Sequence, residues 1–236
     1  VLSTAYRQTS AASAELLRKD PENKLLARAP SYRLPAEMLR DNVLAVSGLL
    51  VDKIGGPPVR PYELEASFKP SKPDTGEGLY RRSLYTYWKR TGPAPVMMTL
   101  DAAKRDVCRV QRERTSSPLQ ALAMLNGPQF VEACRALSHR LIQQHGTDGS
   151  DAILRDMFRC LTSRFPNDKE MKLIDSLYQK QLDYFRANED AMRDYLTIGQ
   201  YADFDSSSHQ IELAILAAWS SVANTLINHD ECVTKR

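Results

Sequence analysis

Cysteine is scarce in this sequence of 236 residues, and the four that occur are never close together. No CxxC or CxxCH pattern is present, which excludes a thioredoxin-type redox site and covalent haem attachment within the chain. Structural zinc sites need close ligand pairs, so the same spacing argues against zinc. We expect each cysteine to be a small buried hydrophobe, with one disulfide of open pairing if the protein is exported. The four are Cys108, Cys134, Cys160 and Cys232.

Long apolar runs are also missing. A helix that spans a bilayer needs about 20 apolar residues, and the longest candidate, residues 211–227, is interrupted by polar residues such as Glu212 and Asn224. This run predicts a buried helix of a soluble fold and no membrane span. Because no signal peptide is recognisable and the chain begins with Val1, we expect it to be a piece of something longer.

The sequence has no recognised catalytic signature. It contains no Gly-rich phosphate loop, no GxSxG and no HExxH, and its four histidines are scattered over expected helices and helix ends. Net charge is also low, at +3, with a pI of about 8.6. This value is too small to imply a nucleic-acid partner, because such proteins concentrate their charge on one face.

What the sequence does contain is a series of helix signals. Apolar residues recur at spacings of three and four after Pro35, which predicts a long helix up to Ile54, closed by Gly55-Gly56. Two short helices are expected before it, one within residues 9–17 and one beginning at Asp20-Pro21-Glu22.

The second half predicts a helical bundle. Ser117 is the expected N-cap of one helix, and Asn167 with Glu170 resembles a capping box at the start of another. Short connections between these helices favour antiparallel neighbours. The expected helices cover residues 118–125, 128–144, 150–163, 168–187, 188–198 and 208–228.

Between these helical regions, residues 55–78 are rich in Pro and Gly and predict a loop. Residues 80–91 have a β-like composition, so a strand or extended segment is favoured there over a short helix. The predicted fold class is therefore mainly α, a helical bundle-like domain with an irregular or β-like insertion. We expect one domain over residues 1–236, made of N-terminal helices (1–54), the insertion (55–110) and the bundle (111–236).

A cluster of arginines in and after the insertion is the main candidate site. Guanidinium groups recognise carboxylate, sulfate or phosphate, so the cluster could form an anion-binding surface. The favoured interpretation is structural: some arginines in the loops form ion pairs with carboxylates elsewhere, and the others are solvated. The candidate binding residues of this segment are Arg81, Arg82, Trp88, Asp101, Arg109, Arg112 and Arg114.

Aromatic residues are interleaved with these arginines, at Tyr80, Tyr85, Tyr87 and Trp88. Packing in the core is the favoured role, ahead of stacking on sugars, with nucleic acid third.

Two acidic residues of the same segment, Asp101 and Asp106, are conceivable as acid and base or as metal ligands. Neither has a histidine nearby, and a helix cap or a partner for an arginine is favoured. We assign no catalytic residue and no metal ligand.

The segments RRSLYTYWKRT and LDAAKRDVCRVQRERTSSPLQALAMLNGPQFVEACRALSHRL, with DPENKLLAR near the start, closely resemble a known family. It is the C-terminal domain of unknown function, type fifteen-fifty-three, of planctomycete cytochrome-c-domain proteins. The resemblance implies export to the periplasm or cell surface and upstream domains of the same polypeptide as partners. It also implies that any haem is held upstream, with no cofactor in this chain.

Two functions remain open from the sequence. The first is a non-catalytic interaction domain of a large exported, cytochrome-c-linked protein. The alternative is an enzyme or binding domain that acts on an anionic polysaccharide, for example a sulfated one, with arginines as anion clamps.

Overall fold

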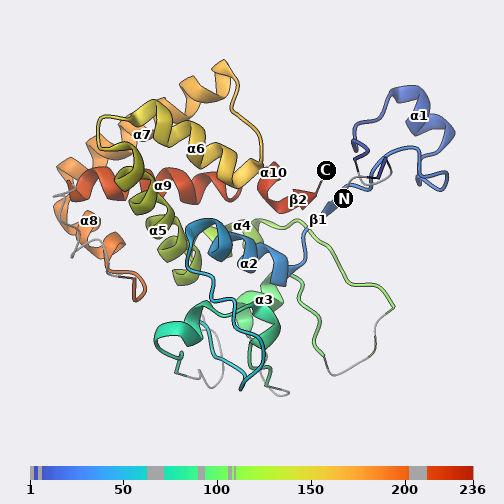
Figure 1. The fold of residues 1–236 in the computed structure, drawn as a ribbon, viewed down its shortest axis with the longest axis horizontal. Coiled ribbons are helices and arrows are strands. Elements are labelled where there is room, and N and C mark those ends of the chain that lie inside the picture. The colour runs from blue at the N-terminus through green and yellow to red at the C-terminus, as the bar shows by residue number, and fades with distance from the viewer. Residues whose placement is uncertain are drawn as a thin grey trace.

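The computed structural model describes residues 3–4, 7–62, 72–89, 94–105, 108, 110–201 and 212–235. Over these residues the fold is mainly α, as predicted, with ten α-helices, two 3-10 helices and one two-stranded sheet (Figure 1). The α-helices are α1 (Ala14–Lys19), α2 (Ala36–Ser47), α3 (Pro95–Thr99), α4 (Pro118–Asn126), α5 (Pro128–His145), α6 (Ser150–Thr162), α7 (Asp168–Ala187), α8 (Glu189–Leu196), α9 (Leu213–Leu226) and α10 (Asp230–Val233). The 3-10 helices are η1 (Gly76–Tyr80) and η2 (Ser83–Tyr85), and the strands are β1 (Tyr32–Arg33) and β2 (Thr234–Lys235).

Helices α5 and α9 form the centre of the bundle. They pack against each other, α7 covers α9, and α2 lies against α5. Trp219 of α9 is fully buried and stacks on Tyr178 of α7 with ring centroids 4.0 Å apart. The apolar residues of these helices, contributed from segments far apart in the sequence, make one continuous core.

Local capping signals predicted several helices well. The Ser117 side chain accepts a hydrogen bond from the Gln120 N–H at the start of α4. At the start of α7, Asn167 and Glu170 form the predicted capping box. Because these signals act within four residues, they are independent of the tertiary fold.

The predicted end of the first long helix is wrong. Helix α2 ends at Ser47, because Gly48 adopts a left-handed conformation with φ of +83° and returns its N–H to the carbonyls of Leu44 and Ala45. The chain then runs away from the helix axis, and Ile54, expected on the apolar stripe, is 92% exposed.

Two further expectations are corrected. No helix begins at Asp20, which instead ends α1, and its carboxylate accepts hydrogen bonds from the N–H groups of Lys24 and Leu25. The strand or extended segment favoured for residues 80–91 is only partly correct: η1 and η2 include Tyr80 and Ser83–Tyr85, and ladder pairing is limited to isolated bridges at Arg81 and Thr86. Residues 90–91 lie outside the described residues. The short helices α3 and α10 and the β1–β2 pair were not predicted.

The segment before β1 forms a small lobe beside the helical body (Figure 1). This N-terminal lobe, residues 3–31, contains α1, which has no buried residue. None of its described residues belongs to the hydrophobic core. Strand β1 joins it to the body by pairing antiparallel with β2, with Tyr32 opposite Lys235.

Candidate functional site

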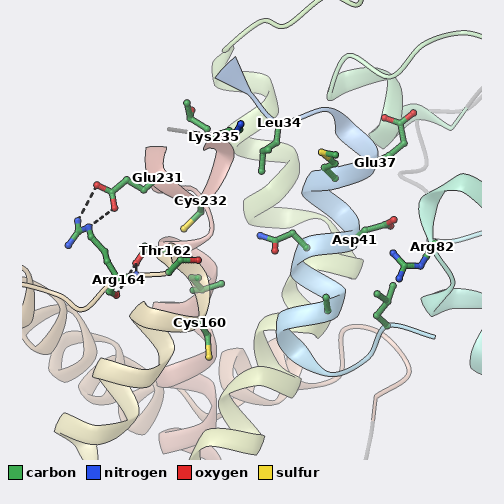
Figure 2. A pocket seen from close by; sticks show the side chains of 17 residues that line it. Leu34, Glu37, Asp41, Arg82, Cys160, Thr162, Arg164, Glu231, Cys232 and Lys235 are labelled. Atoms are coloured by element: carbon green, nitrogen blue, oxygen red, sulfur yellow. Dashed lines mark hydrogen bonds and ion pairs between the residues drawn. The ribbon is translucent and has the colours of Figure 1, made fainter. Parts of the chain in front are cut away.

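An open groove of about 950 Å³ follows α2 on the surface of the body (Figure 2). Helix α2 contributes Met38, Asn42 and Ala45 to its lining. On one side of α2 lie the end of α6 with the turn after it, α10 and β2, and on the other side lies Arg82. The groove is thus built from segments at both ends of the chain, and its shape depends on the bundle holding them together.

Most of the charged side chains along the groove already have hydrogen-bond or ion-pair partners. Arg82 Nε lies 3.0 Å from Asp52 Oδ1, and Arg112 Nη1 lies 3.0 Å from Glu37 Oε2. Asp41 Oδ1 accepts hydrogen bonds from the N–H and hydroxyl of Ser83, at 2.8 and 2.6 Å. These pairs leave the walls of the groove polar but largely neutralised.

Arg164 holds the groove wall between the α6–α7 turn and α10 (Figure 2). Its guanidinium donates to both oxygens of Glu170, at 2.9 and 2.6 Å, and to both oxygens of Glu231, at 2.7 and 3.2 Å. The hydrogen bonds from Arg164 lower the pKa of Glu170 to about 2. Arg164 therefore joins the start of α7 to α10 through two ionised carboxylates.

Two cysteines line the groove, one of them buried and the other exposed. Cys232 is buried, and burial, with a smaller contribution from the charge of Glu231, raises the pKa of its thiol to about 12. A thiol with so high a pKa stays protonated and is a weak nucleophile. Cys160, at the end of α6, is exposed, as is Cys108, so the expectation that every cysteine is buried is wrong for these two.

Arg81, a candidate from the sequence, is buried inside the insertion. Its guanidinium donates to the carbonyls of Lys53, Gly55 and Pro57 and lies 4.0 Å above the centre of the Tyr85 ring. Arg81 therefore stabilises the loop after α2, where the sequence analysis had considered carboxylate partners. Its Nη1 and Nη2 donate to backbone carbonyls and the side chain is buried, so little of it is available to an external anion.

Asp101 lies at the base of the loop that connects α3 to α4. Its Oδ2 accepts hydrogen bonds from the N–H and hydroxyl of Thr115, at 2.6 and 2.7 Å, and from Gln120 at 3.0 Å. Burial acts to raise the pKa of Asp101, but these hydrogen bonds and the charge of Arg33 outweigh it and lower the pKa. A carboxylate stabilised in its ionised form is suited to closing a loop and poorly suited to general acid catalysis.

The other candidates fall into separate places. Asp101 and Arg112 line a hollow of about 60 Å³, whereas Arg114 stacks on Tyr32 at 4.4 Å. Trp88 packs partly buried against the core, under the guanidinium of Arg105 at 4.8 Å. Arg109 and Asp106 lie outside the described residues. Arg112 thus lies close to Asp101 and also pairs with Glu37 of the groove. The candidate residues predicted from the sequence do not come together in one site.

A polar cluster that the sequence analysis missed surrounds Glu132 on α5. This glutamate is fully buried, and its Oε1 accepts four hydrogen bonds. The donors are the hydroxyls of Tyr62 and Tyr80, at 3.2 and 2.8 Å, and the N–H groups of Gln200 and Tyr201, at 2.6 and 2.7 Å. Burial, and then the charge of Glu132, raises the pKa of both tyrosines, so they remain neutral donors.

The same face of α5 carries further buried polar residues. Gln129 binds the guanidinium of Arg40, and His139 contacts the Tyr201 hydroxyl at 2.8 Å. A signal was present in the sequence, because positions 129, 132 and 139 share one helix face opposite the apolar stripe. Their partners, however, are 52 to 89 residues away and could not be identified from it.

Among the described residues, no three His, Cys, Asp or Glu side chains converge as metal ligands. No helix in the described part of the chain has the length and apolar character needed to cross a bilayer. The fold and site together define a mainly α domain with an open, ion-paired groove and a buried polar cluster.

A comparison with protein families identifies the family of this domain. Residues 1–178 match the family PSD1, described as a protein of unknown function (DUF1553), so the chain belongs to that family. The resemblance to the domain of unknown function of type fifteen-fifty-three is thereby confirmed. No curated protein and no solved structure matches the chain.

Proposed function

We propose that this chain is a non-catalytic docking domain of a larger exported, cytochrome-c-linked protein, and that the groove over α2 receives an upstream domain of the same polypeptide. The observation that carries this proposal is the pairing of the groove's charges. Each carboxylate of its lining, on Glu37, Asp41 and Glu231, is held by a neighbouring donor.

Catalysis by a carboxylate requires a group that can exchange a proton or attack a substrate at the working pH. The groove carboxylates are instead held by hydrogen-bond donors, and the Cys232 thiol is kept protonated. Groups fixed in this way give a surface of constant shape, which lowers the entropic cost of binding a partner. Apolar residues Leu34, Met38 and Ala45 supply contact area within the polar border.

The export and the link to cytochrome c rest on the family resemblance. In this proposal the haem belongs to a domain upstream, and the present chain contributes a binding surface only.

Binding of the purified chain to a separately expressed upstream fragment tests the proposal, with titration calorimetry as the measurement. Ala45 is exposed on α2 within the groove, so Ala45→Arg is expected to weaken binding by about tenfold or more through steric overlap and an unpaired charge. The matched control is Ser176→Arg on the exposed face of α7, which should bind like the wild type. If both variants bind the fragment with equal affinity, the groove is not part of the docking surface.

The competing function, binding of an anionic polysaccharide, is tested by thermal shift. Sulfated, uronic and neutral oligosaccharides are added in turn, because a ligand of the folded state raises the melting temperature. A docking domain is expected to give no saturable shift. A saturable shift with one sugar class, lost in Arg112→Ala and kept in Arg186→Ala on the distant α7–α9 ion pair, would overturn the docking proposal.

A further inference from the structure

We propose that the turn from Asp20 to Arg28 is a second docking element. It presents Leu25 and Leu26 to an apolar pocket with an acidic rim on the upstream domain. This inference rests on the proposed function for the identity of the partner, but it concerns a different surface. The turn belongs to the N-terminal lobe, which stands apart from the helical bundle (Figure 1).

Both leucines are exposed to an unusual degree. Leu25 is 80% and Leu26 70% exposed, and neither belongs to the hydrophobic core. Single exposed leucines are common on protein surfaces. Two in succession on a projecting turn are different, because Ala29 is the only buried apolar residue among the described residues of the lobe.

The turn is nevertheless held firmly. Asp20 is only 5% exposed, and its two carboxylate oxygens accept from the N–H groups of Lys24 and Leu25, each at 2.8 Å. Arg28 closes the turn by donating to the carbonyls of Asp20 and Pro21, at 2.9 and 2.8 Å. Polar groups therefore fix the backbone while the apolar side chains remain free for a partner.

The backbone of Leu26 is also strained. Its φ is +53°, a left-handed conformation that a leucine rarely adopts, and Asn23 has the same φ. Asparagine tolerates this conformation, whereas leucine is disfavoured there. Strain kept in place by surrounding hydrogen bonds is typical of functional positions, and here it holds an exposed leucine at a defined angle.

The charge of the lobe indicates the partner's chemistry. Residues 3–31 carry five basic and three acidic side chains. Lys19 and Lys24 pair with Glu15 and Glu22. Arg7 and Arg18 have no carboxylate partner within the described part of the chain. A partner with acidic residues around its apolar pocket would complement this surface.

The test compares affinity for the upstream fragment between the wild-type chain and the double variant Leu25→Ser/Leu26→Asn. Asparagine at position 26 keeps the left-handed backbone, so the variant removes the apolar side chains and preserves the turn. We expect a loss of at least about tenfold in affinity, as for anchor residues of an interface. The control is Leu173→Ser on α7, where the leucine is 73% exposed, and it should change the affinity by less than about twofold.

Three outcomes would overturn the inference. If the wild type binds the fragment and the double variant binds equally well, the turn is not an anchor and the proposed function stands. If the wild-type chain does not bind the fragment, the inference and the proposed function fail together. If sedimentation shows that the isolated chain forms a dimer, and the double variant no longer forms it, a second copy of the chain is the partner.

Discussion

The helical body and the N-terminal lobe both bury a carboxylate, but they differ in where they place their apolar side chains. The body buries the side chain of Glu132 completely, with four donors on one of its oxygens. The lobe buries the carboxylate of Asp20 in a similar manner but leaves two leucines outside. In both places a carboxylate that accepts backbone N–H groups organises a turn, so hydrogen bonding sets the geometry and apolar burial is a separate matter.

The difference lies in what each turn supports. In the body, the Glu132 cluster links the insertion and the start of the α8–α9 connection to α5 by hydrogen bonds. Helix α5 in turn belongs to the core. In the lobe, the Asp20 turn supports only itself and the surface it displays. Changes in the two clusters should therefore differ greatly in their effect on global stability.

The largest effect is expected from Glu132→Ala. It leaves the hydroxyls of Tyr62 and Tyr80 and two backbone N–H groups without an acceptor, at about 1 kcal/mol for each donor and on the order of 4 kcal/mol together. Urea unfolding measures the loss. Glu132→Gln retains one carbonyl oxygen and should lose less, so equal losses in both variants would contradict the assigned role of Oε1.

Gly199→Ala should have the next largest effect. A Cβ at this position would lie 2.6 Å from the Glu132 carboxyl carbon, and the φ of Gly199 is +87°. Steric overlap and backbone strain together should cost about 2 kcal/mol or more.

Gly146→Ala is the matched control for Gly199→Ala, since its φ is +75° and its Cβ would meet nothing within 4 Å. Because its ψ of 168° lies in a region nearly confined to glycine, backbone strain alone predicts a loss of about 1 kcal/mol or more. Thermal unfolding of both variants separates strain from contact with the cluster, and similar losses would mean that Glu132 accommodates the methyl group.

A pH dependence follows from Arg164. Because the folded pKa of Glu170 is about 2, below its ordinary value of 4.5, the ion pair stabilises the fold fully above pH 4.5. This contribution is lost as the pH falls from 4.5 towards 2. The melting temperature of Arg164→Ala should therefore depend less on pH in this window than that of the wild type. Parallel curves for the two proteins would show that Glu170 does not carry the effect.

The smallest global effect is expected in the lobe. Asp20→Ala removes two hydrogen bonds from the turn, so the amides of Lys24 and Leu25 should exchange with deuterium faster. The melting temperature of the body should change little, because the lobe shares no part of the core. A clear fall in the melting temperature would mean that the lobe and body unfold as one unit.

The sequence predicted the elements whose signals are local. The start and the end of α7 could be located because Asn167, Glu170 and the apolar stripe all lie within the helix itself. The end of α2 was misjudged because Gly48 and Gly55-Gly56 are both plausible stops. The choice between them depends on the path of the following chain, where the N–H of Val51 donates a hydrogen bond to the carbonyl of Tyr80.

The candidate site could be predicted only in part. Arg81 and Asp101 were selected by residue type, but the nature of their partners, backbone carbonyls and a threonine, depends on the tertiary fold. Glu132 was overlooked because a single acidic residue in a helix usually faces solvent. Its burial becomes evident only when the insertion and the α8–α9 connection are brought over α5.

The pairing of β1 with β2 has a mechanical consequence. Tyr32 lies opposite Lys235 and Arg33 opposite Thr234 in an antiparallel pair. The lobe and the end of β2 therefore leave the ladder on the same side. Tension applied between them would break the ladder bonds one after another, as in unzipping, and not all together in shear. The lobe should thus detach at low force while the bundle behind it stays folded.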